Sequence, residues 1–278
     1  MLQFVKMHGL GNDYLYVYGP PPADAPALSR LLSDRHFGIG SDGMIYITPP
    51  NSPAADFGMR IFNADGSEAM MCGNGIRCVG KYVFDRGYTD KTELVIDTPA
   101  GLRRLMLHPD PENPAQIASV TVDMGIAIVG DAHTVAAHGQ MLSVIPVSVG
   151  NPHGVIFTEN AEQFPMNLLA AVSTHPTFAG GVNTECARVL SPTSLRMRVY
   201  ERGSGITLAC GTGACAVCAA AVERGFSPAD TPITVHLDGG ELTITVRQNG
   251  TVLMTGEAVS VCEGQTCHDF MRIPPDSM

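Results

Sequence analysis

The chain has 278 residues, of which 45% are hydrophobic and 16% charged, and its formal net charge at pH 7 is −10. This composition excludes a disordered protein and is typical of a globular one with room for two domains. The acidic balance, without any basic run, argues against nucleic acid as a partner, and the apolar stretches are too short to span a membrane.

In chain order, the sequence predicts short strands separated by turns, together with two helices. The proline-rich residues 19–26 predict a surface loop, and residues 109–114, where Pro, Asp, Glu and Asn cluster, predict a boundary between two halves. Apolar residues at helical spacing predict one helix around residues 76–84 and another around 214–222. The predicted strands lie at residues 94–97, 118–122, 144–149, 155–157, 195–200, 233–237 and 242–246.

One four-residue pattern occurs twice, 138 residues apart, as Cys-Gly-Asn-Gly at 72–75 and Cys-Gly-Thr-Gly at 210–213. Other segments repeat at nearly the same offset. An offset that holds through strand, turn and helix indicates the internal duplication of a whole domain. The further matches are Met59–Phe62 with Met197–Tyr200, Arg86-Gly87 with Arg224-Gly225, and Gly11-Asn12 with Gly150-Asn151.

The two repeated cysteines each precede a predicted helix, so each thiol is expected at a helix N-terminus. There the helix dipole and the free backbone amides favour a thiolate and lower the pKa of the cysteine. The second helix is apolar on nearly all sides, which predicts that it is buried. Two such thiols, Cys72 and Cys210, suggest a reaction in which one cysteine acts as a base and the other as an acid.

These features predict an α+β fold of two pseudo-symmetric domains, each a curved, mostly antiparallel β-sheet or barrel around a buried central helix. We expect an N-terminal domain at residues 1–117, to which residues 260–278 return, and a C-terminal domain at 118–259, with the active site in the cleft between them. No signal peptide is visible at the N-terminus, and in its absence the eight cysteines indicate a cytoplasmic protein with mostly free thiols.

Polar residues in predicted turns are the next candidates. Glu201-Arg202 directly follows a predicted strand, where binding sites are common, although a surface ion pair also fits. His153 is either a partner of a thiol or a structural turn residue. Five asparagines lie among glycines, and turn formation alone explains each of them, but together they are typical of a polar pocket around the thiols. They are Asn12, Asn63, Asn74, Asn151 and Asn183.

Neither a metal nor a cofactor is expected. Cys215 and Cys218 form a Cys-x-x-Cys pattern, which zinc and redox sites use, but they lie in an apolar helix without a partnering pair, so packing is favoured. The chain has three lysines, and none lies in a motif that would support a pyridoxal Schiff base. Core packing is also expected for the remaining cysteines, Cys78, Cys186, Cys262 and Cys267.

Six motifs follow one another through most of the chain. They are Met-His-Gly-Leu-Gly-Asn-Asp-Tyr at 7–14, Phe-Asn-Ala-Asp-Gly-Ser-Glu at 62–68, Met-Cys-Gly-Asn-Gly-Ile-Arg-Cys at 71–78, Gly-Asn-Pro-His at 150–153, Gly-Val-Asn-Thr-Glu at 181–185, and the segment 200–215 that begins Tyr-Glu-Arg-Gly and contains the second Cys-Gly-Thr-Gly. In order and spacing they resemble the diaminopimelate epimerase family. Six correlated motifs are far more specific than any single one.

The resemblance implies a pyridoxal-independent epimerase, usually a homodimer, that interconverts LL- and meso-diaminopimelate for lysine and peptidoglycan precursor biosynthesis. Its partner is a small amino-acid substrate. By the same resemblance, Cys72 and Cys210 form the catalytic acid–base pair, and His153 and Glu201 modulate their pKa values. Backbone amides of Gly73, Asn74, Gly211 and Thr212 would hold the α-carboxylate, and further substrate contacts would come from Asn12, Asn63, Asn151, Asn183, Glu201 and Arg202.

Other interpretations remain open at this point. A cofactor-independent racemase of proline or histidine would keep the two thiols and change the substrate, although the Gly-Asn-Asp and Tyr-Glu-Arg segments favour diaminopimelate. A cysteine hydrolase built on His153 leaves the second cysteine unexplained, and a zinc-binding module is the alternative outside enzymes. Gly43, Gly154 and Ile206 depart from residues that are common in the family.

Overall fold

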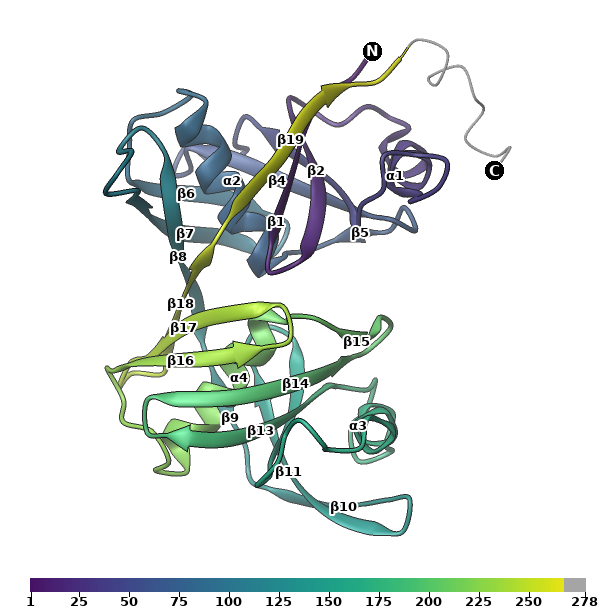
Figure 1. Ribbon diagram of the computed structural model, residues 1–278, viewed down its shortest axis with the longest axis vertical. Helices are drawn as coiled ribbons and strands as arrows, with labels where there is room; N and C mark the ends of the chain where they lie inside the picture. Colours follow the sequence, from purple (N-terminus) through teal and green to yellow (C-terminus); the bar gives the residue numbers. More distant parts are fainter. Residues whose placement is uncertain (268–278) are drawn as a thin grey trace. The chain divides into compact units, whose positions relative to one another are not determined.

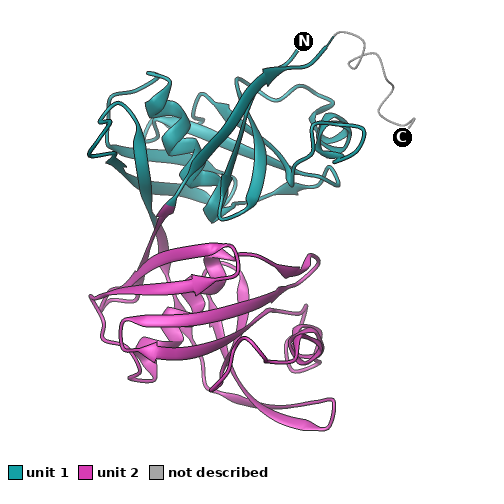
Figure 2. Ribbon diagram, viewed as in Figure 1, with its two compact units in different colours: residues 1–122, 257–278 teal, residues 123–256 magenta. Residues whose placement is uncertain are grey.

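The computed structural model describes residues 1–267 and divides the chain into two compact units (Figure 2). Unit 1 contains Met1–Val122 and the segment from Glu257 onward, and unit 2 contains Asp123–Gly256. The boundaries expected from the sequence lay after residues 117 and 259. Of the segment expected to return to the first domain, residues 268–278 lie outside the described residues.

Unit 1 is a curved sheet wrapped around one long helix, and a shorter helix lies beside it (Figure 1). Its strands pair in the order β19–β1–β2–β3–β4–β6–β7–β8, and β5 is added to β4. The strands are β1 (Gln3–Gly9), β2 (Asn12–Tyr18), β3 (Gly43–Thr48), β4 (Phe57–Asn63), β5 (Glu68–Ala69), β6 (Glu93–Thr98), β7 (Gly101–Pro109), β8 (Ile117–Ile126) and β19 (Val259–Gln265), and the helices are α1 (Ala25–Ser33) and α2 (Gly73–Asp85).

Unit 2 repeats this arrangement in the order β11–β12–β13–β14–β16–β17–β18, with β9 and β10 paired to β11 and β15 to β14. Its strands are β9 (Ile128–Val129), β10 (His133–Ala137), β11 (Gln140–Ser148), β12 (Pro152–Phe157), β13 (Asn183–Ser191), β14 (Ser194–Glu201), β15 (Gly205–Thr207), β16 (Pro232–Leu237), β17 (Gly240–Val246) and β18 (Thr251–Glu257), and its helices are α3 (Met166–Ser173) and α4 (Gly211–Glu223).

The strand pairing confirms the internal duplication. In unit 1, β2 pairs with β3 and β4 pairs with β6 in parallel, within an otherwise antiparallel sheet. In unit 2, the equivalent pairs β12–β13 and β14–β16 are likewise parallel. A parallel pair needs a long crossover connection, and the shorter helix of each unit, α1 or α3, lies in the crossover between the first two parallel strands.

The two long helices begin and end where the repeated pattern predicts. α2 packs on β1, β2 and β7, and α4 packs on strands β11 to β14 and β17. Most of their residues are buried, including the apolar run of α4, as expected from its composition. Gly87 and Gly225 follow the helix ends with φ values of +71° and +73°, a conformation that glycine adopts without the steric penalty of a side chain.

The predicted strands are present, whereas three expectations from the sequence are wrong. Residues 109–114 do not separate the halves, because β7 and β8 on either side of them pair as an antiparallel hairpin. The proline-rich loop ends earlier than predicted, since α1 begins at Ala25 and Pro26 occupies its first turn. Cys262 and Cys267 are exposed instead of packed in the core, because Cys262 lies in β19, most of whose side chains face outward, and Cys267 follows the end of that strand.

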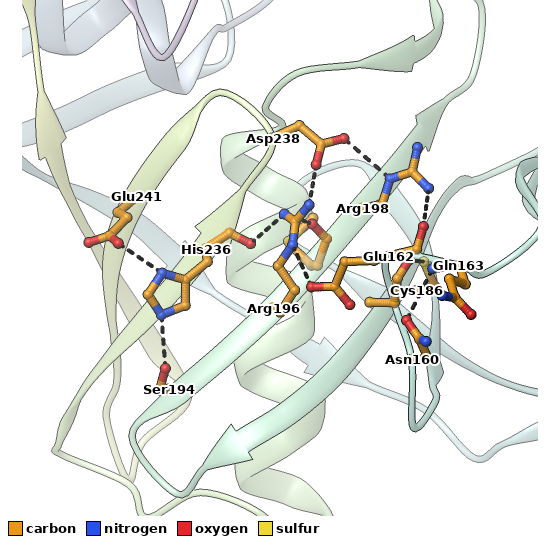
Figure 3. Close-up of polar contacts among 12 residues, drawn as sticks. Asn160, Glu162, Gln163, Cys186, Ser194, Arg196, Arg198, His236, Asp238 and Glu241 are labelled. Atoms are coloured by element: carbon orange, nitrogen blue, oxygen red, sulfur yellow. Dashed lines mark hydrogen bonds and ion pairs between the residues drawn. The ribbon is translucent and has the colours of Figure 1, made fainter.

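A network of arginines and acids fastens β14 to its neighbours in unit 2 (Figure 3). Arg196 forms ion pairs with Asp238 and with Glu162, the latter at 3.3 Å between Nε and Oε1, and Arg198 Nε lies 3.3 Å from Asp238 Oδ2. These contacts join the turn after β16 and the loop before α3 to one strand. Because β14 ends at Glu201, the network fixes the position of the strand that carries this predicted site residue.

Within residues 1–267, the longest helices fall short of the length and apolarity that crossing a membrane requires.

Candidate active site

Each unit contains one cysteine at the N-terminus of its long helix. Cys72 and Cys210 are the N-cap residues of α2 and α4, with extended backbone angles of φ −139°, ψ 116° and φ −124°, ψ 111°. The sulfur of Cys72 accepts from the Gly75 N–H at 3.3 Å, and the sulfur of Cys210 accepts from the Gly213 N–H at 3.4 Å. The thiols thus take the place that a capping oxygen usually fills, where the helix dipole favours negative charge. We call the surroundings of Cys72 half-site 1 and those of Cys210 half-site 2.

Half-site 1 joins the start of β2 to the start of α2. The Cys72 sulfur lies 3.3 Å from Asn12 Oδ1, and Asn12 Nδ2 donates to Asp42 Oδ2 at 2.8 Å. Tyr14 is 6% exposed, and its hydroxyl makes hydrogen-bonding contacts with the side chains of Asn12 and Cys72. Burial raises the pKa of Tyr14 far above its usual value, and the nearby Cys72 raises it further. The phenol therefore stays protonated.

An ion-pair network adjoins Asn12 and fixes the position of its hydrogen-bond partner Asp42. Asp13, the next residue of β2, lies 2.9 Å from Lys6 Nζ and 2.7 Å from Arg35, and Arg35 also pairs with Asp42 at 3.0 Å. Burial opposes the ionisation of Asp13, but its hydrogen bonds to Arg35 and Lys6 outweigh that effect and lower its pKa. Asp42, the carboxylate that accepts from Asn12, is thereby held by Arg35 as well as by Asn12.

Half-site 2 surrounds its thiol with acidic and polar groups. Thr212 Oγ1 lies 3.5 Å from the Cys210 sulfur, Asn183 Nδ2 approaches it at 4.0 Å, and Glu201 is in hydrogen-bonding contact with it. Thr207 of β15 donates to Glu201 Oε1 at 2.5 Å and so fixes that carboxylate. Burial raises the pKa of Glu201 above its usual value.

Behind this thiol lies a buried chain of hydrogen bonds. Glu185 Oε1 is 2.7 Å from His153 Nδ1, and both side chains are 0% exposed. His153 Nε2 is 3.1 Å from Asn151 Oδ1, and Asn151 Nδ2 donates to Thr212 Oγ1 at 3.3 Å. Both ring nitrogens of His153 are therefore engaged, and the ring connects to Cys210 through Asn151 and Thr212.

The pKa of Cys210 does not follow the prediction from the sequence. A helix N-terminus was expected to lower it, but burial raises it well above its usual value, and the carboxylates of Glu201 and Glu185 raise it further. Hydrogen bonds from Thr212 and the Gly213 amide oppose this effect without overcoming it. Desolvation and like charge disfavour the thiolate, so half-site 2 favours the protonated thiol.

Two of the predicted contact residues point elsewhere. Asn63 ends β4 and donates from Nδ2 to Ser67 Oγ at 3.0 Å, within its own turn. The Arg202 side chain donates to the Gly180 carbonyl at 2.5 Å, while its backbone N–H donates to Asn183 Oδ1 at 2.9 Å. The remaining predicted residues of the helix starts lie in the first turns of α2 and α4, namely Gly73, Asn74, Gly211 and Thr212.

Sequence reasoning missed four residues of the two half-sites. Asp42 gave no signal, since it lies in a polar bend without a distinctive pattern, and Thr207 lies within the 200–215 motif but ends the short strand β15 without a feature of its own. Glu185 ends the Gly-Val-Asn-Thr-Glu motif at 181–185, and Tyr14 lies 139 residues before His153, the same offset that relates the Gly-Asn pairs. The duplication therefore offered a signal for Tyr14 that was not used.

The three departures from the family pattern have distinct surroundings. Gly43 has a φ of +154°, and a Cβ there would lie 2.2 Å from the Phe62 carbonyl oxygen, so a side chain would require the backbone to move. Gly154 lies under Val144 and Val182, while Ile206 is 58% exposed in β15. Among residues 1–267, His, Cys, Asp and Glu form no group of three or more that could hold a metal ion.

Comparison with known proteins identifies the family. Residues 4–129 and 145–261 match the family described as Diaminopimelate epimerase. The diaminopimelate epimerase of Acetivibrio thermocellus is 46% identical over 95% of this chain and 98% of its own length, and that of Parabacteroides distasonis is 47% identical over 95% and 97%.

Solved structures of lower identity share the fold. A probable proline racemase from Agrobacterium radiobacter superposes with a TM-score of 0.75 at 16% identity, covering 98% of this chain and 95% of its own, and a hydroxyproline epimerase from Agrobacterium vitis with 0.71 at 17%, covering 96% and 93%. The family match and the high identity over nearly the whole length of both relatives establish the relationship. The chain belongs to the diaminopimelate epimerase family.

Proposed function

We propose that this protein is a pyridoxal-independent isomerase that interconverts LL- and meso-diaminopimelate by acid–base catalysis with two cysteines. Relatives named diaminopimelate epimerase, 43–47% identical over most of the chain, support the substrate. The racemase alternative has weaker support, since the proline-type structures are only 16% and 17% identical. The observation that carries the mechanism is the equivalent placement of Cys72 and Cys210, each as the N-cap of a buried helix in a duplicated unit.

Inversion of an α-carbon requires that a proton leave one face and that another arrive on the opposite face. Two thiols supply both proton transfers if one starts as thiolate and the other as thiol, and they exchange roles in the reverse reaction. The raised pKa of Cys210 beside two carboxylates supports Cys210 as the thiol and therefore Cys72 as the base for one of the two isomers.

The α-proton of an amino acid is a very weak acid, so the negative charge that develops on the carboxylate must be stabilised. We assign this to the free amides at the starts of α2 and α4, those of Gly73, Asn74, Gly211 and Thr212. Preorganised donors of this kind contribute on the order of 10²–10³ in rate each. Catalysis would also require that water be excluded and that each sulfur lie about 3–3.5 Å from the reacting carbon.

The remaining parts of the proposal concern binding and biology. Asn12, Asn151 and Asn183 would contact the substrate from positions already beside the thiols, and Asn63 and Arg202 would have to turn toward it from their present partners. We also propose a cytoplasmic homodimer that acts in lysine biosynthesis. Light scattering of the purified protein tests the homodimer, and a monomer mass would contradict it.

The decisive test incubates the protein with LL-diaminopimelate in D₂O and follows the α-proton by NMR. Loss of that signal together with conversion to the meso isomer is expected for the wild type. Cys72→Ala and Cys210→Ala should each abolish conversion while the circular dichroism spectrum stays unchanged. Conversion by either variant at a rate near that of the wild type would refute the two-cysteine scheme, and conversion of proline instead of diaminopimelate would refute the substrate.

A further inference from the structure

The duplication gives residues of half-site 1 counterparts in half-site 2. Tyr14 in β2 precedes His153 in β12 by 139 residues, the offset that also relates Asn12 to Asn151. Each lies two residues after its asparagine, and each strand pairs antiparallel with the strand before it and parallel with the next long one. Tyr14 therefore occupies the place in half-site 1 that His153 occupies in half-site 2.

The neighbouring strand leaves room for the tyrosine ring. Gly43 is the first residue of β3, as Asn183 is the first residue of β13. A Cβ on Gly43 would lie 3.0 Å from Tyr14 Cε1, in addition to its clash with the Phe62 carbonyl. Half-site 2 thus directs the Asn183 amide toward its sulfur from this position, whereas half-site 1 has no side chain there and is filled by the Tyr14 ring.

The tyrosine and the histidine differ in what they can do with a proton. An imidazole exchanges its proton near neutral pH, whereas a phenol ionises only near pH 10 in water. Tyr14 is 6% exposed as a residue. Its hydroxyl contacts the Cys72 and Asn12 side chains and is kept protonated by its burial. Such a group can donate a hydrogen bond to a thiolate but does not remove the proton of a thiol.

We propose that Tyr14 is a catalytic hydrogen-bond donor, whose O–H donates to the Cys72 thiolate and holds that sulfur in its basic form. The proposal rests on the proposed role of Cys72 as base. When Cys72 takes the α-proton, the sulfur becomes a thiol, Tyr14 keeps its own proton, and the thiol can donate to Asn12 Oδ1, 3.3 Å away. Half-site 1 would thus have a fixed donor at its sulfur, whereas half-site 2 has the hydrogen-bonded chain of Thr212, Asn151 and His153.

Tyr14→Phe tests this, because it removes one oxygen and leaves the ring in place. Tyr46→Phe is the matched control: Tyr46 lies in the adjacent strand β3, is 1% exposed, and its hydroxyl has no hydrogen-bond partner among the residues described. The reaction of Cys72 with iodoacetamide is followed across pH, and its peptide is resolved by mass spectrometry from those of the other cysteines. The rate of α-proton exchange in D₂O is measured alongside.

Loss of a hydrogen bond to a charged acceptor should raise the inflection of Cys72 alkylation by roughly one to two pH units and lower kcat/KM about 10- to 100-fold. The acidic limb of the kcat/KM profile should move to higher pH by a similar amount. Tyr46→Phe should leave both unchanged, and Cys210 alkylation should be unaffected in both variants. A folded Tyr14→Phe protein with the wild-type Cys72 inflection would overturn the proposal, whether or not its turnover falls.

Replacement of Tyr14 by 3-fluorotyrosine keeps the proposal testable if the phenylalanine variant fails to fold. The more acidic phenol is a stronger donor, so it should lower the Cys72 inflection, and no shift or a rise would contradict the proposal. The pH inflection of Cys72 alkylation does not depend on the proposed function, which fails instead if Cys72→Ala keeps its turnover.

Discussion

Glu185 and His153 form a fully buried pair in half-site 2, with 2.7 Å between a carboxylate oxygen and Nδ1 of the ring. The second carboxylate oxygen, Oε2, is buried and has no hydrogen-bond partner among the described residues. A buried carboxylate is costly unless it is paired, so the pair fixes the orientation of the ring and presents Nε2 to Asn151. We therefore expect Glu185 to be a positioning residue that reaches Cys210 through His153, Asn151 and Thr212.

Glu185→Gln keeps the shape of the side chain and removes its charge. We expect kcat to fall about 10- to 100-fold with little change in KM, because the acceptor of the His153 ring loses its negative charge away from the substrate. Nitrogen-15 NMR of the His153 ring should show altered protonation or tautomer. The control is Glu241→Gln, since Glu241 lies 2.8 Å from Nδ1 of His236 in an exposed pair outside the half-sites (Figure 3). Equal turnover in the two variants would contradict the positioning role.

Glu201→Gln should make Cys210 more acidic. Burial is the main cause of the raised pKa of this thiol and stays in place, but the variant removes the carboxylate that contributes most to it after burial. The alkylation inflection of Cys210 should therefore move to lower pH. Because the proposed mechanism needs Cys210 as a thiol in one direction, the basic limb of the kcat/KM profile should also move to lower pH. An inflection unchanged or raised would show that Glu201 does not act on this thiol.

Gly213→Ala should disturb half-site 2 through the carboxylate of Glu185. A Cβ at Gly213 would lie 2.7 Å from Glu185 Oε1, the atom bonded to His153, and 3.3 Å from the Cys210 sulfur. We expect a loss of turnover similar to that of Glu185→Gln, and a double variant that loses less than the sum of the two free-energy changes. At the equivalent Gly75, the Cβ meets the flexible Ile45 methyl at 2.7 Å, so Gly75→Ala should cost less. Additive effects at Gly213 and Glu185 would contradict the shared mechanism.

The fold and the two thiols were predictable because they depend on local chemistry. A cysteine before glycines and a helical apolar pattern defines the starts of α2 and α4, and the offset of 138 shows that the same structure occurs twice. The hairpin at residues 109–114 was mistaken for a boundary because prolines and acids mark tight turns and linkers equally well. α1 and α3 were missed because they are short and their stability comes from packing onto the sheet rather than from their own sequence.

The electrostatics of half-site 2 were not predictable from the chain. The helix N-terminus that lowers a thiol pKa is visible in sequence, but Glu201 and Glu185 approach Cys210 from two different strands. The distance of the two carboxylates from the sulfur and the burial of the sulfur depend on strand register. Together they raise the pKa of Cys210, whereas the helix N-terminus was expected to lower it. Tyr14 shows the opposite case, since its counterpart His153 was identified and the offset would have located it.

Asp13→Asn tests the network that holds half-site 1. Asp13 is 11% exposed in its side chain and pairs with Lys6 and Arg35, so weakening these charged hydrogen bonds should lower the free energy of unfolding at pH 7 by about 1–3 kcal/mol. Asn12 should also become more mobile, with a modest loss of turnover. The exposed Asp131 offers the control Asp131→Asn, which removes the same charge outside the network.

The pH dependence of this effect follows from the lowered pKa of Asp13. A carboxylate whose pKa is lower in the folded than in the unfolded state adds stability above the unfolded value, and this is lost as the pH falls through the folded pKa. Urea unfolding should therefore show a large difference in the free energy of unfolding between wild type and Asp13→Asn at pH 7, and this difference should narrow below about pH 4. A gap that stays constant or widens on acidification would show that the charge of Asp13 does not stabilise the fold, and that the hydrogen bonds of its side chain act without it.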